Sequence, residues 1–105
     1  MLETYYENKL RTSVQKLGNG ARCLKFESPG FSGVPDRIIL LPGSNVIFVE
    51  MKRPGKTERK RQLYVQMLLR ALGFEVFSAV DSEDKIEAVL ARCREVLELE
   101  GILPA

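Results

Sequence analysis

Histidine is absent from the sequence of 105 residues. Its absence excludes Ser-His-Asp and Cys-His nucleophilic sites, histidine-ligated zinc, and hydrolases that use a histidine general base. The two cysteines, Cys23 and Cys93, lie far apart and form no C-x-x-C pattern, so they cannot complete a zinc site by themselves. We expect both to be reduced, buried thiols rather than a disulfide. Any catalysis must therefore rely on carboxylates, lysines, hydroxyls or a hard metal ion.

Long apolar runs are also missing. No segment approaches the ~18 consecutive apolar residues that a membrane span needs, and the first residues lack the basic start and apolar stretch of a signal peptide. Hydrophobic residues make up 45% of the chain and charged residues 29%, a balance typical of globular proteins. We therefore expect one cytoplasmic domain over residues 1–105 with no membrane partner.

Charge is small in total but unevenly distributed. The net charge is +2, yet residues 1–70 hold 13 Lys and Arg against 6 Asp and Glu, while residues 71–105 hold 3 against 8. Such asymmetry can mark one face for a polyanion and turn another away from it. Charge runs are more often solvated faces, so this pattern alone favours nucleic acid only weakly.

Hydrophobic periodicity and turn residues predict the element order α-β-β-β-α-β-α. Helices on both sides of a mixed central sheet would give an α/β three-layer sandwich. The strand that ends near Glu50 should pair in parallel with the strand after the next helix, and both faces of the hairpin strands should be covered. The expected helices cover Glu3 to Leu17, Thr57 as N-cap to Leu72, and a stretch after the cap at Asp81 and Ser82; the expected strands cover Arg22 to Phe26, Arg37 to Leu41, Val46 to Val49, and Phe74 to Val80.

The hairpin around Pro42-Gly43-Ser44 brings two acidic residues together. If these three residues form the loop, Leu41 faces Asn45, and the same register places Asp36 opposite Glu50. Side chains alternate across a strand, so Glu50 and Lys52 point to one face. Two carboxylates and a lysine should therefore converge at one end of an otherwise apolar sheet.

Close carboxylates repel each other unless one is protonated or a cation joins them. Oxygen ligands around an open position suit Mg²⁺ or Mn²⁺, and the backbone carbonyl of Met51 offers a third ligand. A bound metal of this kind activates water and stabilises charge in phosphodiester hydrolysis, and Lys52 could assist either task. The alternative is a plain ion pair between Lys52 and a carboxylate at the end of a strand.

Two short motifs then carry a family resemblance. Gly33-Val34-Pro35-Asp36-Arg37, followed by Phe48-Val49-Glu50-Met51-Lys52, resembles the virus-type replication-repair nuclease (VRR-NUC) domain of the PD-(D/E)-x-K superfamily. That resemblance implies a restriction-endonuclease-like fold with Asp36 and Glu50 as metal ligands and Lys52 as the catalytic lysine. It also implies an active-site role for Gln62 in the next helix and for Glu7 in the first. Glu7 could equally be a solvated residue at the edge of an apolar helix face.

Basic residues gather beside the expected site. Phosphate contacts from Lys and Arg supply affinity that does not depend on base sequence, although a run of this kind can be a solvated helix start. Basic residues at a helix start oppose the helix dipole, which favours a functional reason for them. The candidate DNA-binding residues, which follow the catalytic candidate Lys52, are Arg53, Lys56, Arg59, Lys60 and Arg61.

The expected function is a Mg²⁺- or Mn²⁺-dependent DNA endonuclease that recognises DNA structure rather than base sequence. Small members of the resembled family are phage or bacterial proteins that look like four-way (Holliday) junction resolvases acting as homodimers. Two alternatives remain open from the sequence. One is a nuclease of the same fold that cuts flaps, ends or plain duplex, and the other is a nucleic-acid-binding module without catalysis.

Overall fold

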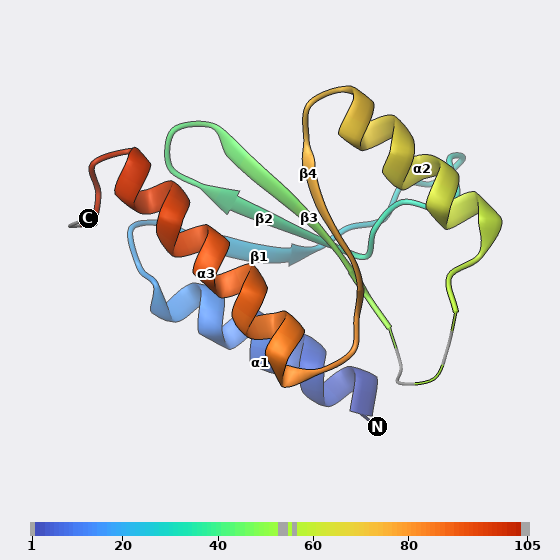
Figure 1. The fold of residues 1–105 in the computed structure, drawn as a ribbon, viewed down its shortest axis with the longest axis horizontal. Helices are drawn as coiled ribbons and strands as arrows, with labels where there is room; N and C mark the ends of the chain where they lie inside the picture. Colours follow the sequence, from blue (N-terminus) through green and yellow to red (C-terminus); the bar gives the residue numbers. More distant parts are fainter. Residues whose placement is uncertain (1, 53–54, 56, 104–105) are drawn as a thin grey trace.

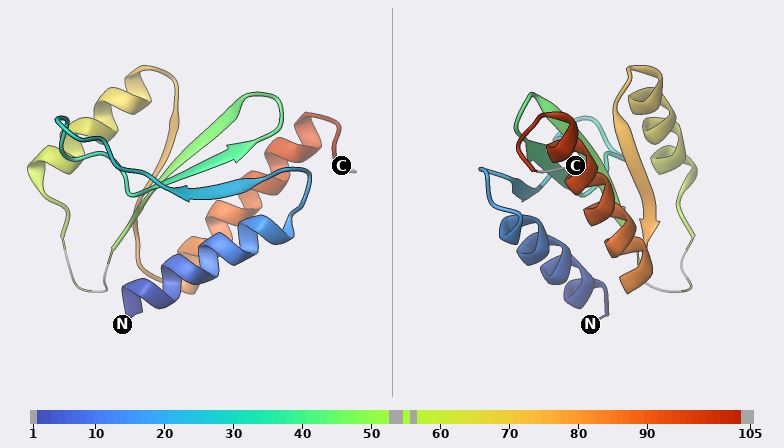
Figure 2. Two further views of the ribbon diagram at one scale, coloured as in Figure 1. Left: turned by 180° about the vertical axis from the view of Figure 1, so that it is seen from behind. Right: turned by 60° about the vertical axis from the view of Figure 1, so that its left-hand side comes forward.

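A four-stranded sheet separates two layers of helix in the computed structural model, which describes residues 2–52, 55 and 57–103 (Figure 1). Helices α1 and α3 cover one face of the sheet, and α2 lies on the other side (Figure 2). This is the predicted three-layer sandwich with the predicted element order. The elements in chain order are α1 (Leu2–Lys16), β1 (Arg22–Lys25), β2 (Arg37–Leu41), β3 (Asn45–Met51), α2 (Lys60–Ala71), β4 (Glu75–Val80) and α3 (Glu83–Leu99).

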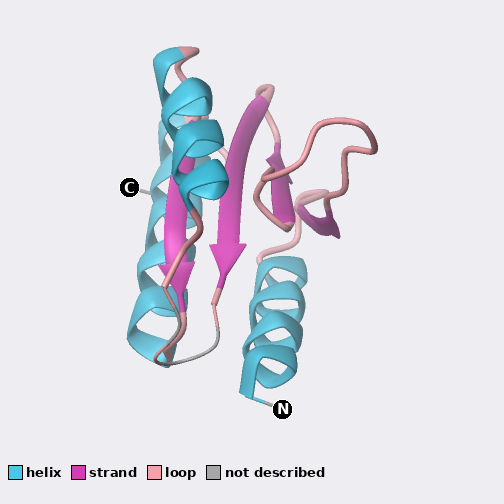
Figure 3. Ribbon diagram, turned by 90° about the vertical axis from the view of Figure 1, so that its right-hand side faces the viewer, coloured by secondary structure: helices cyan, strands magenta, loops and turns pink. Residues whose placement is uncertain are grey.

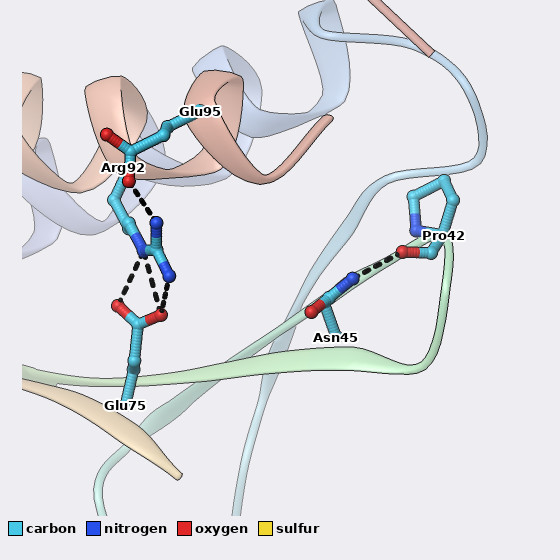
Figure 4. A network of polar contacts seen from close by, with 5 residues as sticks. All are labelled: Pro42, Asn45, Glu75, Arg92 and Glu95. Atoms are coloured by element: carbon cyan, nitrogen blue, oxygen red, sulfur yellow. Dashed lines mark hydrogen bonds and ion pairs between the residues drawn. The ribbon is translucent and has the colours of Figure 1, made fainter. Parts of the chain in front are cut away.

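The sheet is mixed, with strand order β1-β2-β3-β4. Strands β1, β2 and β3 pair antiparallel, whereas β3 and β4 pair in parallel, and Figure 3 shows these two strands pointing to the same end of the molecule. The β2–β3 register runs from Leu41 opposite Asn45 to Arg37 opposite Val49, which confirms the predicted register. Within the turn, the Asn45 side-chain amide donates a 2.9 Å hydrogen bond to the Pro42 carbonyl (Figure 4).

The main core lies between the sheet and the pair α1 and α3. Leu10 of α1, Ile39 and Val49 of the sheet, and Val89 of α3 are all fully buried. Each such side chain contributes about 1.5–3 kcal/mol by leaving water. This apolar layer therefore fixes β3 in the centre of the sheet.

Polar contacts also fasten α3 to the edge strand. Arg92 lies 2.7 Å from a Glu75 carboxylate oxygen at the start of β4, and its guanidinium also contacts Glu95 (Figure 4). Ser82 accepts a hydrogen bond from the Lys85 N–H and caps α3, as the sequence predicts. The Arg92 contacts thus join α3 to the start of β4, and the Ser82 cap marks the first turn of α3.

Both cysteines are free and buried in the core. Burial raises the pKa of the Cys23 thiol to about 11 and that of Cys93 to about 12. Because the thiolate is the reactive form, these groups belong to the packing of the domain. Within the described residues, no helix has the length and apolar character needed to span a bilayer.

Two sequence expectations need correction. Helix α2 begins at Lys60 with Arg59 as its N-cap rather than Thr57, because the Gln62 side chain accepts a hydrogen bond from the Arg59 N–H. The hairpin strands are also not covered equally: β3 is buried from Ile47 through Met51, whereas Leu40 of β2 is 37% exposed. Helix α2 sits against β4, so the second face near β2 has no helix over it (Figure 2).

An extra residue in β4 changes the register beside the end of β3. Val49 pairs with Phe77, but Met51 pairs with Val80, and Ala79 adopts a positive φ of 53°. A bulge of this kind bends the strand and alters its twist. Pairing resumes where the Lys52 N–H donates a 2.8 Å bond to the Val80 carbonyl, so Lys52 leaves the sheet from a fixed position.

Candidate active site

Asp36 is held from two sides at the start of β2. Its carbonyl accepts a 2.8 Å hydrogen bond from the Phe26 N–H, which extends the pairing of β1. Its carboxylate oxygen Oδ1 accepts a 2.9 Å bond from the Met51 N–H. One more step of the β2–β3 register places Asp36 opposite Glu50. The hairpin therefore brings Asp36 to the end of β3, as predicted.

Glu50 and Lys52 lie at the same end of β3. Glu50 is only 4% exposed, and burying a carboxylate is costly unless hydrogen bonds or a cation compensate. The Gln62 amide of α2 joins the two residues: its Nε2 donates a 3.2 Å bond to Glu50 Oε2, and its Oε1 accepts a 3.0 Å bond from Lys52 Nζ. Gln62 thus lies beside Glu50 and Lys52, as the family resemblance implies.

The same glutamine explains the start of α2. Gln62 Oε1 also accepts a 2.9 Å bond from the Arg59 N–H. A side chain at the third helical position that binds the N-cap amide forms half of a capping box. Helix α2 therefore starts where Gln62 can reach both its own N-terminus and the end of β3, two residues later than an N-cap at Thr57 would place it.

Glu7 approaches the site from α1. It forms a 3.2 Å ion pair with Arg37, and both side chains are largely buried at 23% and 12% exposure. Arg37 directly follows Asp36, so α1 is fastened to the start of β2. Glu7 is therefore not a fully solvated surface residue. A direct role of Glu7 in metal binding stays a prediction.

Burial raises the pKa of Asp36 to about 6 from its ordinary value of 3.8. The Met51 N–H bond acts in the opposite direction, and the negative charge of Glu7 adds to the increase. A carboxylate whose charged form is disfavoured is suited to a cation, because a bound cation would restore that charged form.

The oxygen donors at the site fit a hard divalent cation better than zinc. Among the residues that the structure describes, no three His, Cys, Asp or Glu side chains gather in a way that could hold a metal. Asp36 and Glu50 offer carboxylate oxygens, the kind of donor that Mg²⁺ prefers. Mg²⁺ is commonly bound by one or two carboxylates while it keeps several waters.

The predicted basic residues separate into different settings. Arg53 and Lys56 lie outside the described residues. Arg59 and Lys60 are exposed at the start of α2. Arg61, by contrast, donates a 3.0 Å hydrogen bond from Nε to the Ser32 carbonyl, so it also fastens the loop before Asp36 to α2.

Sequence reasoning missed three polar residues around the site. Besides Arg37, these are Gln66, which is 1% exposed, and Glu58, to which the Gln66 amide donates a hydrogen bond. Gln66 follows Gln62 by one helical turn, so the two amides share the face of α2 that is turned toward the sheet. This spacing of four residues was the one feature of the sequence that could have placed Gln66 near Gln62. Nothing local links Glu58 to Gln66.

Asp36→Asn should stabilise the metal-free protein above pH 6. The native state holds the Asp36 proton more tightly than the unfolded chain does, so its contribution to stability falls as pH rises from about 4 to about 6. Asparagine keeps an oxygen for the Met51 N–H and carries no charge. Allowing for partial solvent exposure, we expect a gain on the order of 1 kcal/mol at pH 8, measured by urea unfolding in EDTA.

The gain should vanish near pH 4, where the native carboxyl is protonated. Asp84→Asn is the matched control, because Asp84 is an exposed carboxylate in the first turn of α3. It should show no gain that grows with pH. An Asp36→Asn variant that is less stable than the parent at pH 8 would refute this account of the buried charge.

Comparisons with known proteins agree with this geometry. No family profile matches the chain. A protein named as a candidate nuclease, p44, of Acyrthosiphon pisum secondary endosymbiont phage 1 is 44% identical over 82 residues, which is 78% of this chain and 85% of that protein. A solved structure described as a VRR_NUC domain superposes with a TM-score of 0.77 at 25% identity, covering 87% of this chain and 96% of that one. The motif resemblance, the sequence relative and the superposed structure agree, and the chain belongs to the VRR-NUC family of nucleases.

Proposed function

We propose that the protein is a metal-dependent, structure-selective DNA endonuclease that hydrolyses phosphodiester bonds. The observation that carries the proposal is the Gln62 amide, which joins Glu50 and Lys52 at the end of β3 beside Asp36. A binding module without catalysis would gain nothing from a buried carboxylate held in this way, because the burial weakens the fold.

In this proposal Asp36, Glu50 and the Met51 carbonyl hold Mg²⁺ or Mn²⁺. The bound cation would lower the pKa of a water and offset negative charge on the scissile phosphate. Hydrogen bonds from the Met51 N–H to Asp36 and from Gln62 to Glu50 fix the two carboxylates before any ligand arrives. Fixed ligands of this kind lose little freedom on binding a metal.

Lys52 is the proposed catalytic lysine. Its ammonium lies on the same strand face as Glu50 and is held by Gln62 at 3.0 Å. From there it can orient the attacking water or stabilise the charge that develops on the phosphate in the transition state. Gln62 is a positioning residue in this scheme, since it acts through Glu50 and Lys52.

The substrate is proposed to be DNA. Arg59, Lys60 and Arg61 lie at the start of α2, directly beside Gln62, and Arg53 and Lys56 occur in the connection that leads there. These residues would bind phosphates without reading bases. Glu7 of α1 is proposed to assist the active site in two ways. It forms the ion pair with Arg37, and its negative charge raises the pKa of Asp36.

Four-way junctions are the proposed substrate within DNA. Symmetric cutting of a junction needs two sites related by a two-fold axis, and a homodimer supplies them. The relative p44 comes from a phage, which fits action on phage DNA in the cytoplasm of a bacterial host. This choice rests on family analogy, and a flap, end or duplex nuclease of the same fold is the alternative.

Lys52→Ala should abolish cleavage while leaving DNA binding intact. We expect the native protein to nick synthetic four-way junctions in Mg²⁺ or Mn²⁺ faster than flaps or linear duplex. Loss of the ammonium should slow cleavage by at least about 100-fold, the usual effect of removing one group that stabilises the transition state. Asp36→Asn should be equally inactive.

Binding is compared by gel shift in Ca²⁺, and both variants should retain affinity within about three-fold of the native protein. If the native protein cleaves no DNA in either metal, it is a binding module instead. Equal cleavage of junctions and linear duplex would retain the nuclease and reject junction selectivity.

Gln62→Ala should lower kcat about 10- to 100-fold, the range seen when a residue that orients metal ligands is removed. KM for DNA should change little, because Gln62 holds Glu50 and Lys52 and is not itself a phosphate contact. Gln15→Ala, at an exposed position of α1, is the control and should keep native kinetics. A Gln62→Ala protein with native kcat would remove Gln62 from the mechanism.

The native protein should be a dimer in solution at micromolar concentration. Size-exclusion chromatography with light scattering measures this directly, since the chain mass is 11.9 kDa and a dimer doubles it. A monomer that stays monomeric on a junction would contradict symmetric resolution and favour the flap or end nuclease.

A further inference from the structure

Two exposed aromatic rings flank an arginine beside the candidate site. The Arg61 guanidinium lies 4.7 Å from the centre of the Phe31 ring and 5.3 Å from that of the Tyr64 ring. Phe31 is 42% exposed and Tyr64 is 45% exposed. We call these three residues the aromatic platform.

The platform is held in a fixed arrangement. Arg61 donates its 3.0 Å bond to the Ser32 carbonyl, and a Cβ at Gly33 would come within 2.7 Å of Arg61 Cγ. Gly33 also has a φ of +91°, so the loop can approach α2 closely only with glycine here. The two rings therefore come from a loop and a helix that are tightly packed against each other.

Packing alone does not account for the two rings. Neither Phe31 nor Tyr64 belongs to the buried core cluster, and the hydrogen bond and close approach at Gly33 already join the loop to α2. Leaving two aromatic rings in water forgoes the stabilisation that burial would bring. Exposed aromatic side chains on a rigid, basic surface are the usual platform for unpaired nucleobases.

The platform also lies next to the proposed chemistry. Arg61 precedes Gln62, so their Cα atoms are about 3.8 Å apart, and the loop that carries Phe31 leads directly to Asp36. Arg59 and Lys60, exposed at the same helix start, supply positive charge for the neighbouring phosphates. A nucleotide stacked here would be close to the phosphodiester bond that is cut.

We propose that Phe31, Arg61 and Tyr64 bind an unpaired nucleobase of the DNA substrate by stacking. This inference rests on the proposed nuclease function and adds a feature that distinguishes DNA with unpaired bases at a branch, such as a flap, from fully paired DNA; a strong preference of this kind favours the flap nuclease named above as the alternative. Every base offers a π face, so stacking selects unpaired nucleotides without selecting sequence. Fully paired duplex keeps its bases inside the helix and gains nothing from the platform.

The test compares two DNA probes in EDTA, where no cleavage occurs. One is a linear duplex, and the other is the same duplex with a short unpaired flap that carries 2-aminopurine at the branch. For Phe31→Leu and Tyr64→Leu, which keep apolar volume and remove the ring, affinity for the flap should fall about 10-fold. Affinity for the linear duplex should stay within about two-fold, and the change in 2-aminopurine fluorescence on binding should be lost.

Two control variants make the result specific. Tyr64→Phe keeps the ring and should behave as the native protein. Tyr5→Leu removes a tyrosine that is 52% exposed on α1, away from the platform, and should not change the preference for the flap. Thermal unfolding of each variant shows whether the loop and α2 still pack.

An equal loss of affinity for both probes, or no loss for either, would refute the proposal that the aromatic platform binds an unpaired base. So would a fall in thermal midpoint that accompanies weaker binding to both probes, because the rings would then be structural. Cleavage in Mg²⁺ separates this inference from the proposed function. If both leucine variants cleave as the native protein does and keep its preference for the flap, the stacking proposal alone is rejected. If the native protein binds the flap selectively but cleaves no DNA, the nuclease proposal alone is rejected.

Discussion

A carboxylate buried at the end of an apolar strand is the constraint on which this structure depends. Glu50 follows four apolar residues of β3 and is almost fully buried, and burial of such a charge disfavours folding unless polar groups surround it. The Gln62 amide provides one such group, and in doing so it sets the start of α2. A requirement of the site has thereby shaped the architecture around it.

The two helical layers divide structural and chemical roles between them. Helices α1 and α3 bury the apolar face of the sheet and hold β3 in the centre. Helix α2 covers the other face only near β4, and it brings Gln62 to the end of β3 and Arg61 to the loop before Asp36. One face thus carries the main core, while the other carries the proposed site.

Stability and chemistry oppose each other at Asp36. Burial raises the pKa of this carboxyl to about 6, so the charged form that the proposed role as a metal ligand requires is the form that the metal-free fold disfavours. The bond from the Met51 N–H reduces the penalty without removing it. Functional sites often carry a strain or charge that the rest of the fold must offset.

The sequence by itself determined the strand pattern, the hairpin register and the meeting of Asp36, Glu50 and Lys52, because alternation and turn length act over a few residues. Only the tertiary structure decided the late start of α2, the Glu7–Arg37 and Glu58–Gln66 pairs and the stacking of Arg61 on Phe31. Apart from the start of α2, these contacts join residues 8 to 30 positions apart. No local propensity specifies such contacts; they form when packed layers bring distant polar groups within hydrogen-bonding reach.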